Sequence, residues 1–217
     1  MADMARLRQV MVDTQVRPSD VTKFPIIAAM LDVPREAFVP SAQRDVAYSE
    51  TPLPLGDGRE MLEPRTLAKL LDLLDVERED DVLVIGGNLG YSTALLAHMA
   101  RSVVSIECDD AMVGEAEAAL TGLGVDNAVV LCAPLTDGKP DAAPFDVILI
   151  EGAVMRFPDV LLDQLAEGGR IVAIVQGDAV GEARIGIKSE GRIGWRYAFN
   201  ADGPVLPGFA VERQFAL

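Results

Sequence analysis

Asp81-Val-Leu-Val-Ile-Gly-Gly-Asn-Leu-Gly-Tyr91, followed by Ser102-Val-Val-Ser-Ile-Glu107, has the pattern of a strand, a glycine turn, a helix and a second strand that ends in an acid. Its first apolar run is β-branched and aliphatic, which is typical of a strand covered on both faces. Gly86 allows the chain to turn sharply into a helix that begins near Tyr91. These features predict the cofactor half of a Rossmann-like α/β fold.

The glycine spacing and the terminal acid discriminate between two cofactors. At the end of the second strand, the carboxylate of Glu107 can accept hydrogen bonds from both hydroxyls of a nucleoside ribose. A dinucleotide pyrophosphate requires Gly-x-Gly-x-x-Gly, but Asn88 and Tyr91 hold the second and third glycine positions. S-adenosylmethionine has no phosphate and requires only a close backbone turn and a ribose acid, which Gly86, Gly90 and Glu107 supply. We therefore favour S-adenosylmethionine; NAD, and a sheet whose turns are glycine-rich for structural reasons alone, are the alternatives.

Length and composition indicate one compact domain. The chain has 217 residues, half of them hydrophobic, which is enough for a single large core. We expect residues 1–217 to form one domain, with a helical N-terminal extension and acceptor loop over residues 1–75 and the cofactor-binding sheet over residues 76–217. No apolar run is long enough to span a bilayer, and Met1–Arg8 has no apolar signal core, so we expect a cytoplasmic protein without a membrane partner.

Charge and cysteine content argue against several classes of partner. The formal net charge of −15 disfavours nucleic acid, since binding to the phosphate backbone depends on Lys and Arg. Solubility is sufficient to explain this acidity. The single histidine and the isolated Cys108 and Cys132 predict neither a metal site nor a disulfide. Both cysteines are expected to behave as small buried hydrophobes.

Strands and helices alternate after residue 80, as in a parallel sheet with right-handed crossovers. A turn at Ser189-Glu-Gly-Arg192 separates two further strands and predicts a hairpin. The expected result is a seven-stranded sheet that ends in an antiparallel hairpin. Residues 49–63 contain several turn-forming residues and no apolar periodicity, which predicts an ordered loop. Strands are predicted at 82–85, 102–107, 128–131, 147–150, 171–175, 183–188 and 193–199.

Several strings of this chain resemble the protein-L-isoaspartate O-methyltransferases. The strings over residues 33–40 and 52–56 are specific, because a generic Rossmann sheet does not need them. The resemblance implies an S-adenosylmethionine-dependent enzyme that methylates isoaspartyl carboxylates in damaged proteins, so isoaspartyl-containing proteins or peptides are the implied partners. The matching strings are Val33-Pro-Arg-Glu-Ala-Phe-Val-Pro40, Pro52-Leu-Pro-Leu-Gly56, the loop over residues 82–91 with Glu107, Pro144-Phe-Asp-Val-Ile-Leu-Ile150 and Glu167-Gly-Gly-Arg-Ile-Val172.

This sequence also differs from the family pattern. Leu62 replaces a hydroxyl residue beside the methyl-transfer site, Ala133 begins a replacement of the Gly-Asp-Gly beside the adenine, and Glu151 stands where a small or hydroxyl residue is usual. The catalytic residue and the oligomeric state therefore stay open, and a same-fold methyltransferase with another acceptor or a catalytically silent cofactor-binding or assembly protein are the alternatives. The implied cofactor-binding residues are Leu62, Glu63, Gly86, Asn88, Gly90, Tyr91, Glu107, Cys108, Ala133 and Glu151, and the implied acceptor pocket consists of Tyr48, Pro52 and Leu62.

Overall fold

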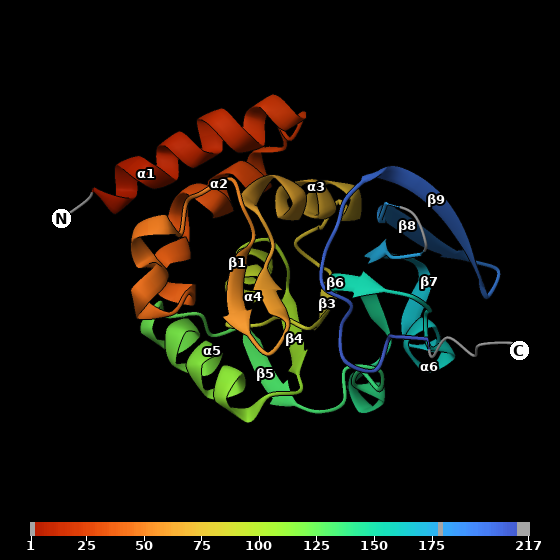
Figure 1. Cartoon of the computed structure of the whole chain (residues 1–217). Coiled ribbons are helices and arrows are strands. Elements are labelled where there is room, and N and C mark those ends of the chain that lie inside the picture. The colour runs from red at the N-terminus through yellow and green to blue at the C-terminus, as the bar shows by residue number, and fades with distance from the viewer. Residues whose placement is uncertain (1–2, 178–179, 212–217) are drawn as a thin grey trace, which may run out of the picture.

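A seven-stranded sheet forms the centre of the computed structural model, which describes residues 3–177 and 180–211 (Figure 1). Its strands run in the order β5-β4-β3-β6-β7-β8-β9. The first five of these are parallel, and β8 and β9 are added antiparallel. This architecture confirms the predicted Rossmann-like sheet with its terminal hairpin. The strands are β3 (Asp81–Ile85), β4 (Ser102–Glu107), β5 (Ala128–Cys132), β6 (Phe145–Val154), β7 (Leu165–Val175), β8 (Glu182–Ser189) and β9 (Arg192–Asn200).

The central strand β3 determines where a ligand can bind. β4 and β6 pair with it on either side, and its apolar side chains are buried because they alternate between two hydrophobic clusters on opposite faces of the sheet. The register opposes Ile85 to Ile106, so the turn after β3 lies next to the end of β4. The Gly86 N–H donates to the Ile106 carbonyl at 2.9 Å. The glycine turn and Glu107 therefore meet at the carboxyl edge of the sheet, where open α/β sheets bind their ligands.

Helices cover the sheet and also form the expected N-terminal segment. Figure 1 shows α1 and α2 together at one end of the molecule. In α3, four leucines at helical spacing are buried, which gives the helix its core-facing stripe. Asp109 caps α5 by accepting from two backbone amides. The helices are α1 (Met4–Met11), η1 (Val12–Val16), η2 (Arg17–Ser19), α2 (Phe24–Asp32), η3 (Arg35–Phe38), η4 (Ser41–Val46), α3 (Pro64–Leu74), α4 (Tyr91–Ala97), α5 (Asp110–Gly122), η5 (Pro140–Ala142) and α6 (Asp159–Asp163).

A short hairpin occupies part of the segment predicted to be a loop, so that prediction was wrong for residues 53–61. Strand β1 (Leu53–Gly56) pairs antiparallel with β2 (Arg59–Met61). The turn between them is made possible by positive φ angles at Gly56, Asp57 and Gly58. Prolines in and beside β1 hide the alternation that normally identifies a strand. The hairpin is a separate two-stranded sheet.

The segment after β9 returns to the carboxyl edge of the main sheet. Val205 forms a parallel bridge with Ala153 of β6. The Ala153 N–H donates to the Pro204 carbonyl at 2.8 Å, and the Leu206 N–H donates to the Ala153 carbonyl at 2.9 Å. Leu206 and Phe209 are buried among the apolar side chains on one side of the sheet. Residues 204–209 therefore pack beside the glycine turn, as part of the wall of the candidate site.

Candidate functional site

The turn after β3 has the backbone conformation expected of a cofactor loop. Gly86, Asn88 and Gly90 have φ angles of 74°, 52° and 95°, and Gly90 is the N-cap residue of α4. Asn88 tolerates the left-handed region because its short polar side chain can hydrogen-bond locally. A Cβ placed on Gly87 would lie 2.3 Å from Ser105 Oγ, so any larger residue at this position would have to displace the Ser105 hydroxyl. Sequence analysis did not identify this constraint, which arises from the neighbouring strand.

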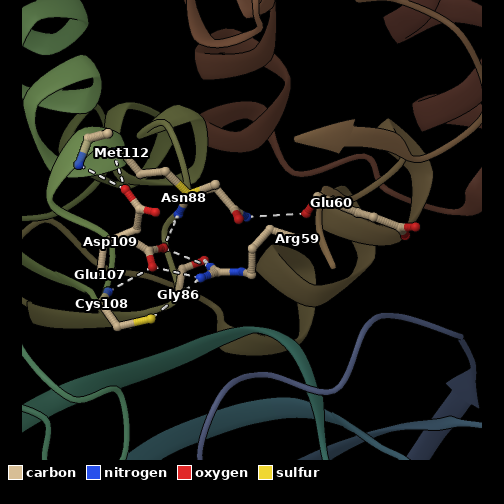
Figure 2. A network of polar contacts seen from close by, with 9 residues as sticks. Arg59, Glu60, Gly86, Asn88, Glu107, Cys108, Asp109 and Met112 are labelled. Carbon is tan, nitrogen blue, oxygen red and sulfur yellow. Dashed lines mark hydrogen bonds and ion pairs between the residues drawn. The ribbon is translucent and has the colours of Figure 1, made fainter. Parts of the chain in front are cut away.

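Glu107 ends β4 as predicted, and its carboxylate is completely buried. Figure 2 shows the donors that surround it. The backbone amides of Asn88 and Cys108 donate to it at 3.0 and 2.7 Å. Arg59 supplies two more donors, with Nη1 at 2.6 Å from Oε1 and Nη2 at 2.7 Å from Oε2. Both carboxylate oxygens are therefore fully used by this chain.

Arg59 is a site residue that the sequence did not reveal. It extends from β2 toward the end of β4, and its Nη2 also donates to the Gly86 carbonyl at 3.2 Å (Figure 2). Burial alone would lower the pKa of the guanidinium, but the hydrogen bonds and negative charge of Glu107 raise that pKa above its usual value. Arg59 and Glu107 therefore form a buried ion pair, with exposed side-chain fractions of 5% and 0%. No local pattern in the sequence connects these two residues.

An open cavity of about 540 Å³ lies beside the Glu107 end of β4. Ala133, one of the expected cofactor-binding residues, lines it together with Pro207 and Gly208. Cys108 and Cys132 also line it and are exposed, so the prediction that they are buried hydrophobes was wrong: both stand just beyond the covered part of the sheet. The pKa of Cys108 is raised chiefly by burial, and a hydrogen bond with Asp110 raises the pKa of Cys132 to about 11. Both thiols are therefore protonated at neutral pH.

Glu151 lies in β6 near the turn and is buried. Its carboxylate accepts a hydrogen bond from the Ser92 hydroxyl at the start of α4. Burial raises the pKa of Glu151 to about 7, although Ser92 and the positive charge of Arg35 oppose this shift. Glu151 is thus a carboxyl group that changes its charge near neutrality. Sequence analysis placed it at the cofactor cleft but did not indicate its protonation.

Tyr91 and Arg35 form a buried layer beneath the turn. The Arg35 guanidinium lies 4.9 Å from the centre of the Tyr91 ring, which is tilted against Phe38 with 5.8 Å between ring centroids. Arg35 donates to the carbonyls of Ala47 and Leu62, both at 2.7 Å. Tyr91 is 1% exposed, so it supports the loop from below. Arg35 holds the backbone at Leu62 in place through its hydrogen bond to the Leu62 carbonyl.

The expected acceptor residues only partly come together. Pro52, Leu62 and Glu63 line a cavity of about 260 Å³ between the start of α3 and the end of β9. Glu63 accepts from Thr66 Oγ1 at 2.7 Å. Tyr48 is not among the residues that line this cavity: its hydroxyl is held by Arg8 Nε at 2.9 Å and by Glu36. It therefore joins the N-terminal helices to the segment after α2.

The donor set fits a nucleoside cofactor, with one obstruction. The turn provides a tight backbone bend, Glu107 provides a buried carboxylate at the end of β4, and the cavity at Ala133 provides a largely apolar surface beside it. However, the carboxylate is already paired with Arg59. In residues 3–177 and 180–211 there is no cluster of three or more side chains suited to bind a metal ion. The same part of the chain contains no helix that is both long and apolar enough to cross a membrane.

Comparisons with known proteins agree with this geometry. A family model described as protein-L-isoaspartate(D-aspartate) O-methyltransferase matches residues 8–195. Protein-L-isoaspartate O-methyltransferase 1 of Syntrophobacter fumaroxidans is 37% identical over 189 residues, which cover 87% of this chain and 88% of that protein. A protein-L-isoaspartate O-methyltransferase of Syntrophus aciditrophicus is 40% identical over 172 residues, 79% of this chain and 78% of that protein.

Solved structures show the same fold. A protein-L-isoaspartate O-methyltransferase superposes with a TM-score of 0.80 at 23% identity, over 94% of this chain and 65% of its own. A putative protein-L-isoaspartate O-methyltransferase from Plasmodium falciparum, solved with S-adenosyl-L-homocysteine, superposes with a TM-score of 0.78 at 18% identity, over 95% of this chain and 99% of its own.

Proposed function

The chain belongs to the protein-L-isoaspartate(D-aspartate) O-methyltransferase family, and from this premise we propose that it is an S-adenosylmethionine-dependent enzyme that methylates isoaspartyl carboxylates in damaged proteins. The observation that carries the proposal is the match over residues 8–195, which spans both the glycine turn and Glu107. We also propose that the enzyme acts in the cytoplasm and works as one domain. Joint packing of the N-terminal helices and the main sheet in one apolar cluster supports the latter.

The residues at the carboxyl edge have distinct roles in this proposal. The backbone around Gly86 and Gly90 would lie against the methionine part, Glu107 would accept the ribose hydroxyls, and the cavity at Ala133 would hold the adenine. When bound, S-adenosylmethionine supplies a methyl group on a positively charged sulfur. A carboxylate acceptor is negative and carries no proton to remove, and transfer of the methyl group neutralises both its charge and that of the sulfonium. Orientation and exclusion of water therefore matter more than a general base. This chemistry is compatible with a site that has no evident catalytic base.

Leu62 favours a second candidate, a methyltransferase of the same fold with another acceptor. The cavity beside Leu62 is the candidate acceptor pocket, and an apolar side chain there cannot donate a hydrogen bond to a carboxylate. Losing one oriented donor commonly costs about 3 kcal/mol of transition-state stabilisation. Arg65 and Asn200 line the same cavity and carry N–H groups that could take over this orientation, whereas the Thr66 hydroxyl already donates to Glu63.

Calorimetric titration with S-adenosylmethionine, followed by a methyl-transfer assay, tests both candidates. The substrates should be an isoaspartyl peptide and its normal aspartyl twin, which differ only in the linkage. Transfer to the isoaspartyl peptide alone is expected from the first candidate. Cofactor binding without transfer to either peptide would reject isoaspartyl methylation and leave the second candidate, whereas failure to bind the cofactor would reject both.

A further inference from the structure

Arg59 uses the same acceptor atoms that a cofactor ribose would need. Its two terminal nitrogens lie 2.6 and 2.7 Å from the two oxygens of Glu107. The exposed fractions of 5% and 0% mean that a second ligand cannot reach the carboxylate past the guanidinium. Two parallel N–H donors facing a carboxylate resemble the two O–H donors of a ribose diol. The side chain therefore mimics the part of the cofactor that Glu107 is expected to bind.

The space over the turn is also filled from both sides. A Cβ placed on Gly86 would lie 3.2 Å from Arg59 Nη2 and 3.0 Å from Leu206 Cδ1. Leu206 also covers Gly152, where a Cβ would lie 2.7 Å from Leu206 Cγ. The glycines thus give room to side chains of this chain itself. A ligand that approaches the backbone of Gly86 has to displace them.

Among the residues that the structure describes, the hairpin that carries Arg59 shares no strand pairing with the main sheet, and Leu53 and Met61 anchor it in the apolar core. Strand β2 pairs with β1 and with no strand of the seven-stranded sheet in the described chain. The turn over residues 56–58 is exposed. Besides Arg59, a side-chain contact between the hairpin and the cofactor loop is the Asn88 Nδ2 donation to the Glu60 carbonyl at 3.3 Å (Figure 2). A swing of the Arg59 side chain therefore breaks its hydrogen bonds to Glu107 and to the Gly86 carbonyl and leaves the strand pairing of both sheets intact.

We propose that Arg59 is an internal occupant of the ribose position and that the cofactor binds only after this guanidinium leaves Glu107. The inference rests on the proposed function, because it concerns the same cofactor. If the state with Arg59 withdrawn is only a small fraction of the molecules, the apparent affinity for the cofactor falls in proportion to that fraction. Replacing Arg59 with a neutral residue should then tighten cofactor binding, which is the opposite of what loss of an ordinary binding residue does.

Calorimetry with two ligands tests this proposal. S-adenosyl-L-homocysteine probes the whole site without turnover, and adenosine probes the nucleoside half alone. We expect Arg59→Gln to lower the Kd of both ligands about tenfold. Arg59→Lys should give a smaller gain, because an ammonium group lacks the planar fork of the guanidinium. Arg184→Gln is the matched control, since Arg184 forms an exposed ion pair with Glu182 outside the site.

The outcomes separate this inference from the proposed function. Equal affinities of the native protein and Arg59→Gln, or weaker binding by the variant, would overturn the inference while the cofactor assignment stands. A gain with S-adenosyl-L-homocysteine but none with adenosine would overturn the ribose position. If neither the native protein nor a folded variant binds either ligand, the inference and the cofactor assignment both fail. Should Arg59→Gln lack a cooperative thermal transition, Arg59→Lys decides the question by the same criteria.

Discussion

The replacement Glu151→Gln should stabilise the protein increasingly as the pH rises. Glu151 is buried, and its pKa is raised from 4.5 to about 7. A group with a raised folded-state pKa contributes stability that is present below the unfolded pKa and is lost as the pH rises through the folded pKa. Each pKa unit corresponds to about 1.4 kcal/mol, so the native protein should lose about 3 kcal/mol relative to the glutamine variant across this interval. Glutamine keeps an acceptor for the Ser92 hydroxyl but cannot ionise.

Urea unfolding at a series of pH values measures this effect. Between about pH 5 and about pH 8.5, the difference in unfolding free energy between Glu151→Gln and the native protein should grow by about 2 to 3 kcal/mol. Glu117→Gln, on the exposed face of α5, is the control for loss of a surface carboxylate. A difference that stays constant over this range would refute the reasoning, because it would mean that Glu151 ionises equally easily in the folded and unfolded states.

Three further changes test the cofactor site, the acceptor pocket and a helix cap. Glu107→Ala should abolish the stabilisation by S-adenosylmethionine, which for the native protein is about 2.7 kcal/mol at a hundredfold excess over Kd; an unchanged shift in melting temperature on adding the ligand would contradict this. The same variant should lower the unfolding free energy of the unliganded protein by about 3 kcal/mol, because Arg59 is left buried and unpaired. Leu62→Ser should raise turnover on isoaspartyl peptides by restoring a hydrogen-bond donor, and should lower the unfolding free energy by about 3 kcal/mol because Leu62 is buried. A fall in turnover, measured at a temperature where the variant is folded, would reject the proposed effect of Leu62 on the acceptor. Asp109→Ala should lower the unfolding free energy by about 1 kcal/mol in chemical denaturation, since two backbone amides of α5 lose their acceptor; no change would show that the cap is energetically silent.

The main sheet was predictable from the sequence because its strands carry continuous apolar runs separated by turn residues. Val82 to Ile85 is such a run, and the structure places it as the buried central strand. Glu107 was expected at the end of the next strand for the same reason. These inferences depend only on residues that are close together in the chain, so they need no knowledge of tertiary packing.

The hairpin and its ion pair were not predictable by that route. Strand β2 has only three residues, too few to show an alternating pattern, and Pro54 interrupts the pattern of β1. The Arg59–Glu107 contact joins positions 48 residues apart. Such a pairing depends on how the hairpin lies over the sheet, which is a property of the folded chain. Tyr48 was likewise expected in the acceptor pocket, but its hydroxyl lies between Arg8 and Glu36, which is a property of the tertiary fold.

Because residues 204–209 return to β6, one wall of the candidate site is made only after the whole main sheet. A ribosome delivers the chain from the N-terminus, so the seven strands are synthesised before Leu206 emerges. Until then, the backbone at Gly86 and Gly152, which Leu206 covers, remains uncovered. The wall formed by residues 204–209 is therefore added after the strands against which it packs. The cleft is thus completed by a segment that belongs to none of the strands it closes.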